Sequence, residues 1–172
     1  QGGSFVNAAG AKFVVRSEWI DESRVLDQGW SYGFRGQGQT LSFRNDGHFE
    51  VRAASGTVSA VMTGFDVLTR YPIVNNGTVV AVAPENVYAF DLGASGSFTN
   101  TGTVSVKAGV TGVGVYFSGV ASPAGNQFNN SGTIDVYAGE YAVGLFIDGF
   151  DGNQINNSGQ IIARKGAGSP YA

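Results

Sequence analysis

The sequence predicts an all-β fold: a parallel β-helix of about five coils, formed by one domain over residues 1–172. Two observations predict it. The motif [Phe/Ile]-x-Asn-x-Gly recurs at intervals of 25–30 residues, and a strand of alternating apolar and polar residues follows each copy. These strands are rich in Val, Ile, Phe, Tyr and Thr, which suit a pleated surface, and helical periodicity is nearly absent. Strands of constant length joined by variable loops indicate a solenoid in which each repeat makes one coil.

The motif defines the repeat. Its clear copies are FRNDG (43–47), IVNNG (73–77), FTNTG (98–102), FNNSG (128–132) and INNSG (155–159), and a degenerate copy, FVNAAG, lies at 5–10. Each copy reads as a strand, a turn, a second strand, a variable loop and a third short strand. We therefore assign residues 43–172 to the coils. Residues 1–42 form a weakly repetitive N-terminal segment that we expect to cap them.

The motif asparagines are expected to form a ladder. In stacked coils, about 4.8 Å apart, equivalent residues lie above one another. Their amides can then bond to the next coil and to the turn backbone, which offsets the cost of burying them. Asn and Gly also tolerate the left-handed backbone of tight turns. A structural role is therefore favoured over a ligand role for Asn45, Asn75, Asn100, Asn130 and Asn157 and for Gly47, Gly77, Gly102, Gly132 and Gly159. A shorter ladder is expected at Thr78, Thr103 and Thr133.

Composition excludes several classes of function. Charged residues make up 13% of the chain, the net charge is −3 and the pI is about 5.0. Nucleic-acid binding needs a basic surface, and so does attraction to an anionic membrane. The chain has no cysteine, so disulfides and thiolate metal sites are excluded, and its one histidine excludes sites that need two. No apolar run approaches the length of a membrane-spanning helix, and nothing implies a cofactor.

The N-terminal segment differs from the repeats. Residues 16–39 contain both tryptophans, and Ser17 could cap a short helix over residues 18–26. We expect this segment to cap or pack beside the first coil, with a binding insertion as the alternative. Within it, Trp30, Tyr32, Phe34 and Arg35 could stack on sugar rings, because aromatic side chains present flat apolar faces with a polar edge. Ordinary packing is the favoured reading of these four residues.

Two further clusters of polar residues could bind a metal ion or act in catalysis. Asp148, Asp151 and Asn153 lie on a glycine-rich loop whose oxygens could hold Ca²⁺, but their spacing does not match an EF-hand, and a solvated loop without metal is favoured. His48 and Glu50 share one face of a strand with Arg52 and could supply a general base. No nucleophile motif accompanies them, so a solvated sheet face is favoured. The remaining carboxylates are scattered and mark no paired-carboxylate site.

The sequences NNGTV, NTGTV, NNSGTI and NNSGQI, each followed by an alternating strand, resemble the β-helical passenger repeats of bacterial autotransporters and of filamentous-haemagglutinin-like exoproteins. The resemblance covers residues 43–172 and is poor over residues 1–42. It implies a right-handed β-helix that is secreted to, or displayed on, the outer surface of a Gram-negative bacterium, with a role in cell adhesion and virulence. The hallmarks of a two-partner-secretion domain are not evident.

The expected function is therefore a non-enzymatic structural or adhesive segment. Its partners would be a glycan or protein on a host or neighbouring cell, with no nucleic acid and no membrane span. The sequence stops at Ala172, where further strand residues are expected. This suggests either a piece of a longer passenger or an open end that stacks on another copy. The alternatives are a self-assembling extracellular filament subunit, and a carbohydrate-active β-helix enzyme or phage tailspike-like protein.

Overall fold

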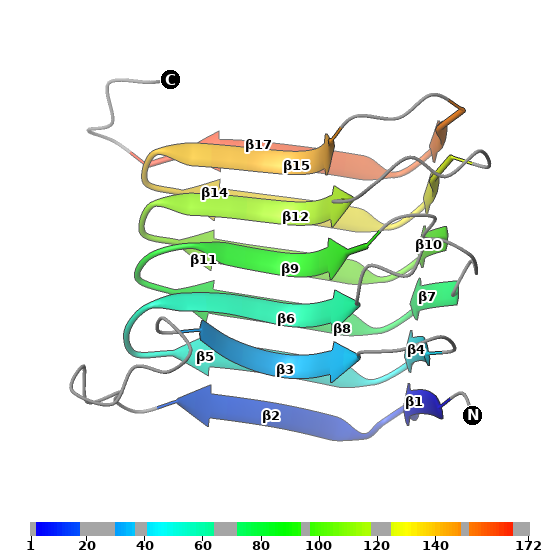
Figure 1. The fold of residues 1–172 in the computed structure, drawn as a ribbon, viewed down its shortest axis with the longest axis horizontal. Coiled ribbons are helices and arrows are strands. Elements are labelled where there is room, and N and C mark those ends of the chain that lie inside the picture. Colours follow the sequence, from blue (N-terminus) through cyan, green and yellow to red (C-terminus); the bar gives the residue numbers. More distant parts are fainter. Residues whose placement is uncertain are drawn as a thin grey trace.

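The chain folds as a right-handed β-solenoid in a computed structural model that describes residues 3–17, 30–36, 41–63, 72–93, 97–117, 125–148 and 152–166. In Figure 1 the chain runs to the right along the front strands and to the left along the strands behind, and it climbs from β1 at the bottom to β17 at the top. Every strand pairing in the described residues is parallel. The predicted all-β, parallel β-helical class is confirmed.

Three parallel sheets form the walls of the solenoid. The first holds β1 (Gly3–Asn7), β4 (Leu41–Asn45), β7 (Pro72–Asn75), β10 (Ser97–Asn100), β13 (Gln127–Asn130) and β16 (Gln154–Asn157). The second holds β2 (Lys12–Ser17), β5 (His48–Ala53), β8 (Thr78–Ala83), β11 (Thr103–Ala108), β14 (Thr133–Ala138) and β17 (Gln160–Lys165). The third holds β3 (Trp30–Gly36), β6 (Thr57–Thr63), β9 (Val87–Leu92), β12 (Thr111–Phe117) and β15 (Tyr141–Ile147).

Each coil uses one strand from each sheet, so the described strands make five three-strand coils, and β16 and β17 begin the next. The motif lies on the first strand of a coil and on the turn after it. The third strand was expected to be short, but in β12 and β15 it has 7 residues, whereas the first strand of the same coils has 4. The three walls are therefore unequal in width.

The corners of the coil differ in length. From the second coil onward, only two residues separate the first strand from the second, as at residues 101–102 and 131–132. The connection from the third strand to the next coil varies instead, from residues 93–96 to residues 118–126. From the second coil onward, variation in loop length is thus concentrated at this corner of the solenoid.

Inward side chains stack into continuous columns that form the core. The aromatic or Ile position of the motif supplies one column, in which Phe98 stacks on Phe128 with ring centroids 5.7 Å apart. The second strand supplies three more, at its second, fourth and sixth positions. The largest fully buried side chains of these and neighbouring columns include Phe43, Phe49, Phe90, Phe98, Phe117, Phe128, Ile73 and Ile134. Burial of these columns is the main force that holds the coils together.

The described part of the N-terminal segment forms a coil, which the sequence did not reveal. Strand β1 pairs with β4 and places Asn7 opposite Asn45, while β2 pairs with β5 and β3 with β6. This segment therefore covers the second coil with strands of its own. Two extra residues in the turn after Asn7 and the twelve residues between β2 and β3 hide the repeat. The expected helix at 18–26 lies outside the described residues, and Ser17 ends strand β2.

Candidate functional site

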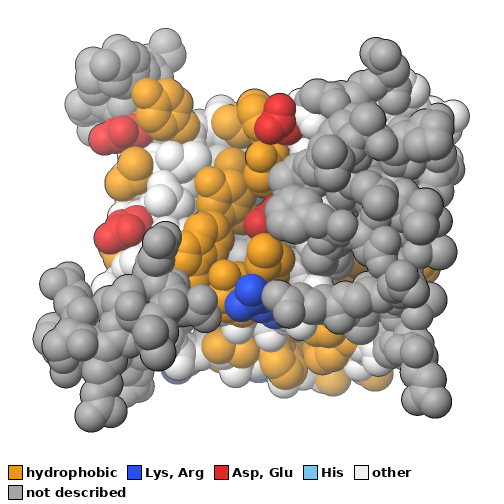
Figure 2. Space-filling view, viewed as in Figure 1, with side chains coloured by type: hydrophobic (Ala, Val, Ile, Leu, Met, Phe, Trp, Pro, Cys, Tyr) orange, Lys and Arg blue, Asp and Glu red, His pale blue; other side chains and the backbone are white. Residues whose placement is uncertain are grey.

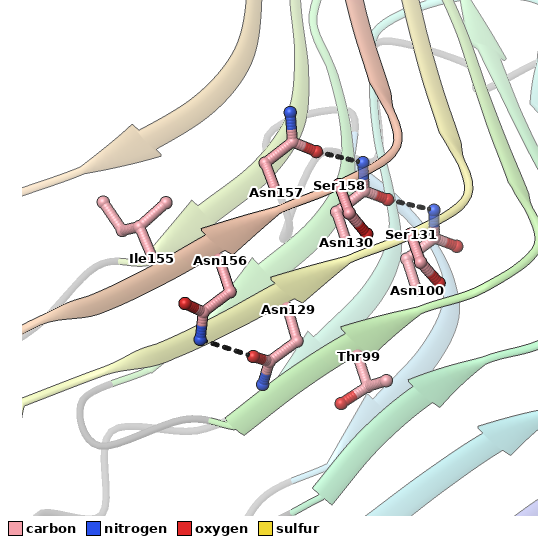
Figure 3. Close-up of a pocket in the computed structure, with 9 residues that line it drawn as sticks. All are labelled: Thr99, Asn100, Asn129, Asn130, Ser131, Ile155, Asn156, Asn157 and Ser158. Atoms are coloured by element: carbon pink, nitrogen blue, oxygen red, sulfur yellow. Dashed lines mark hydrogen bonds between the residues drawn. The ribbon is translucent and has the colours of Figure 1, made fainter.

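The motif asparagines form the predicted ladder, and it is longer than the sequence indicated. The Nδ2 of each asparagine donates to the Oδ1 of the equivalent asparagine in the next coil. The five bonds run from Asn7 to Asn45 (2.7 Å), to Asn75 (2.8 Å), to Asn100 (2.8 Å), to Asn130 (2.7 Å) and to Asn157 (2.7 Å). Figure 3 shows the last two of these bonds. The ladder thus joins all six coils that have a first strand.

The buried amides of the ladder are well satisfied. Asn45, Asn75 and Asn100 are fully buried, and Asn130 is 3% exposed. Besides the bond to the next asparagine, each Nδ2 donates to a backbone carbonyl of the next coil, as Asn45 does to Thr78 at 3.1 Å. A buried amide without partners would destabilise the fold, whereas one whose N–H groups are bonded contributes to a unique register. The ladder therefore fixes how successive coils are aligned.

The motif glycines are required by close approach between coils. A Cβ built on Gly77, Gly102, Gly132 or Gly159 would lie against the carbonyl oxygen of the motif glycine one coil before it. That same oxygen accepts a hydrogen bond from the backbone N–H that follows, as Thr103 donates to Gly77 at 2.8 Å. The expectation that a left-handed backbone explains these glycines is wrong. Positive φ angles occur among the described glycines at Gly10, Gly56, Gly125 and Gly152, which lie outside the five clear motif copies.

The threonines Thr78, Thr103 and Thr133 share one register column, as expected of stacked coils. A second row of polar side chains runs along the outside of the turn. Asn76 donates to Asp46 at 2.7 Å, and Thr101 donates to Asn76 at 2.9 Å. Such exposed bonds contribute little to stability. This row lies on the surface of the turn, whereas the buried ladder beneath it aligns the coils.

The ladder ends at the C-terminal edge in a shallow hollow of about 490 Å³. Asn129, Asn130, Asn156 and Asn157 contribute to its lining, and Figure 3 shows their side chains beside Ile155. Asn156 donates to Asn129 at 3.0 Å, so the outer row continues here too. Ile155 occupies the core column of the motif but is 54% exposed. The last described coil therefore presents both an apolar and an amide surface.

Three of the four residues that were suggested to stack on sugar rings lie on the outer face of the third sheet, and the fourth, Phe34, does not. Trp30, Tyr32 and Arg35 lie on the outer side of β3, where Trp30 stacks on Tyr32 at 6.0 Å and the Arg35 guanidinium lies 4.8 Å from the Tyr32 ring centroid. Phe34 instead packs on the core, with its ring 5.3 Å from Phe5. Phe34 is therefore a packing residue and does not share the outer surface.

Sequence reasoning missed the aromatic residues that continue this outer surface. The Trp30 ring stacks on Tyr88 at 5.9 Å, although β3 and β9 are separated by β6. Tyr88 lies 5.9 Å from Tyr116, and Tyr116 lies 5.3 Å from Phe146. Tyr116 and Phe146 occupy equivalent positions in adjacent strands, and their separation of 30 residues was the only available signal.

Asp148 and Asn153, the two suggested calcium ligands that the structure describes, do not form a metal site. Asp148 is exposed directly after β15, and the Asn153 side-chain oxygen accepts a bond from the backbone N–H of Asn126 at 2.9 Å. Asp151 lies outside the described residues. Across the described part of the chain, no three His, Asp or Glu side chains gather in a way that could hold a metal ion.

His48, Glu50 and Arg52 form a charge cluster on the outer face of β5. The Glu50 carboxylate bonds to His48 Nε2 at 2.9 Å and to Arg52 Nε at 2.6 Å, and Arg16 Nη2 lies 3.7 Å away. Hydrogen bonds from His48 and then Arg52 lower the pKa of Glu50 to about 2. Glu50 is only 6% exposed, so the expectation of a fully solvated face is wrong here. The cluster ties the first coil to the second.

Comparison of this chain with protein-family models, with curated proteins and with solved structures found no match. Within the described ranges, no helix is long and apolar enough to span a bilayer.

Proposed function

We propose that the chain is a non-enzymatic structural and adhesive segment of a bacterial surface protein, similar in role to an autotransporter passenger and located outside the cell. The observation that carries the proposal is the uninterrupted asparagine ladder from Asn7 to Asn157. A ladder and core that continue through every described coil favour a stiff rod, because each coil is held by its neighbours in one register. A rod of this kind suits projection of a binding surface away from a cell.

The composition of the outer surface supports the same role. Short polar side chains such as Thr103, Ser105 and Thr133 point outward between the buried positions of the second strands. The second sheet thus offers a long polar face on which these short side chains alternate with charged residues such as Asp135 and Arg164, and which can make many weak contacts along its length. Partners would be glycans or proteins on a host or neighbouring cell.

Adhesion of coated beads tests this proposal. Beads carrying the folded chain should be retained on monolayers of epithelial cells, or on a lawn of Gram-negative bacteria, more than beads carrying albumin. As a matched control, beads carry the Asn100→Ala chain after it has been unfolded by heating, so that the same surface is present without the fold. Retention equal to that of albumin beads, on both cell types, would reject an adhesive role.

A self-assembling filament subunit is the second candidate, and the direction of the ladder favours it. Every Nδ2 points toward the C-terminal coil, so Asn157 presents a donor at one edge while Asn7 presents an acceptor at the other. Ile155 and Ile161, which occupy core columns, are 54% and 36% exposed at the C-terminal edge. A second copy could add its first coil there and continue both columns.

Light scattering and electron microscopy over a range of concentrations test the filament candidate. Polymers should form, and Ile161→Lys should prevent them, because a charge would then occupy the core column at the junction. The control is Gln160→Lys, which adds the same charge at the neighbouring outward position. A parent chain that stays monomeric at every concentration would remove this candidate.

A further inference from the structure

The third sheet carries an aromatic strip on its outer face. We define the outer aromatic strip as Tyr32, Trp30, Tyr88, Tyr116 and Phe146. In this order, the centroids of neighbouring rings are at most 6.0 Å apart. It crosses the sheet from β3 to β15. With strands about 4.8 Å apart, its length is about 19 Å. Figure 2 shows hydrophobic side chains gathered in a band along the middle of this face.

The strip lies outside the core. On β6, Val58 and Ala60 belong to the core, so Ser59 between them points outward. Ser59 lies in register with Tyr32 on one side and Tyr88 on the other. The small side chains of Thr57 and Ser59 leave room for Trp30 and Tyr88 to meet above β6. The rings therefore bridge three strands and form one continuous apolar surface.

Polar groups accompany the rings. Ser59 Oγ is fully buried beneath the rings, and none of the described residues forms a hydrogen bond with it. The Arg35 guanidinium covers Tyr32 at one end of the strip. Burial, and then the Asp91 carboxylate, raise the pKa of Tyr88; burial and then Asp148 raise that of Tyr116. Asp91 is in register with Tyr116 on the neighbouring strand, and Asp148 directly follows β15, so two carboxylates accompany the strip.

We propose that the outer aromatic strip binds a neutral, extended oligosaccharide. The apolar C–H faces of successive sugar rings would lie on the aromatic rings, and their hydroxyls would bond to the tyrosine hydroxyls and to the neighbouring carboxylates and guanidinium. Asp91 and Asp148 disfavour anionic glycans and nucleic acid, because like charges repel. A chain of sugars that extends along the solenoid axis would contact several coils at once. This inference rests on the proposed adhesive function and names its ligand class.

Titration with cello-, chito- and manno-oligosaccharides tests the inference. Calorimetry measures affinity, and tryptophan fluorescence of a Trp19→Phe chain reports on Trp30 alone. Removing a ring, as in Tyr116→Ala or Phe146→Ala, should weaken binding of the preferred oligosaccharide about tenfold. Phe146 is 47% exposed, so its removal leaves the fold intact. The matched control is Tyr137→Ala, which removes an exposed tyrosine from the outer side of β14 and should leave affinity unchanged.

Two results would overturn the inference: no saturable binding of any of these oligosaccharides, or loss of affinity in Tyr137→Ala as large as in Tyr116→Ala. Bead adhesion separates it from the broader proposal. Beads with the Tyr116→Ala/Phe146→Ala chain that adhere as well as the parent would show that adhesion does not depend on the strip, and would leave the adhesive role standing. Oligosaccharide binding by a chain whose beads do not adhere would support the site and reject the adhesive role.

Discussion

Asn75 donates its side-chain amide to Asn100 at 2.8 Å, and both residues are fully buried although 25 positions separate them in the sequence. The bond is one link of the ladder, so each member between Asn7 and Asn157 is both a donor to the next coil and an acceptor from the previous one. Removing one member therefore affects three coils at once.

Asn100→Ala should lower the free energy of unfolding by about 2–4 kcal/mol, because the Asn75 amide loses its acceptor and Asn130 loses its donor in a buried setting. Urea denaturation measures the change. Asn129→Ala is the control, since Asn129 lies one residue before the ladder on the partly exposed outer row, and its loss should cost about 0.5 kcal/mol or less. Equal destabilisation by both variants would contradict the ladder's role.

Gly139→Ala should destabilise the protein far more than Gly166→Ala. The two glycines follow the second strand of successive coils. A Cβ at residue 139 would meet the Gly109 backbone carbonyl, whereas at residue 166 its nearest neighbour is the hydroxyl end of the Tyr137 side chain, which can move. We expect a loss of about 3 kcal/mol or more at residue 139 and about 0.5 kcal/mol at residue 166. Thermal unfolding followed by circular dichroism distinguishes them, and similar melting temperatures would show that the coils can separate at this corner.

Glu50 should make stability depend on pH in the acid range. Its folded-state pKa of about 2 lies below the value near 4 of an unfolded glutamate, so its contribution is complete above about pH 5 and is lost as the pH falls toward 2. Glu50→Gln should cost about 1–2 kcal/mol at pH 7 and flatten the stability profile between pH 5 and 2. Denaturant unfolding at a series of pH values measures this.

Glu85→Gln is the matched control, because Glu85 is exposed in the turn between β8 and β9 and its substitution removes the same charge. It should leave the profile of the parent chain intact. An acid profile that Glu50→Gln does not change would mean that the cluster with His48 and Arg52 contributes nothing to folding.

Phe34→Ala should destabilise the chain by about 2–4 kcal/mol, because its ring fills the core beside Phe5 and Phe43. Trp30→Ala removes a larger side chain from the same strand but from its outer face, and about 1 kcal/mol is expected. Chemical denaturation of the two variants ranks them. A Trp30 variant that is the less stable of the two would reverse our assignment of the two faces of β3.

The ladder could be predicted because one residue type returns at one position of every clear copy, which is what stacking demands. The faces of the third sheet could not. On β3, Trp30 and Tyr32 point outward, and simple alternation would place Phe34 with them. Yet a Cβ at Gly33 would already point inward, against Val51 and Phe49, and the next side chain, Phe34, also packs on the core. Alternation breaks within the strand, so a period of two misassigns the residues beyond it.

Two other features depend on partners that the sequence places far away. The Glu50 cluster draws Arg16 from the first coil, which has no clear motif to reveal its register. The outer aromatic strip depends on rings that meet across β6, and no residue type recurs at one position of the repeat to indicate it. Both features form because long side chains contact residues on other strands, and these contacts are known only once the strands are stacked.

The variable corner between the third strand and the next coil sets where this fold can acquire new sequence. Residues 118–126 occupy the same place in their coil as residues 93–96 do in theirs, yet the ladder bonds on either side remain at 2.7–2.8 Å. The alignment of successive coils is set at the two-residue turn after the first strand. Segments inserted at the other end of that strand need not disturb it. In the coils after the first, diversification by insertion, and engineering by the same route, should therefore proceed mainly along that line of the solenoid.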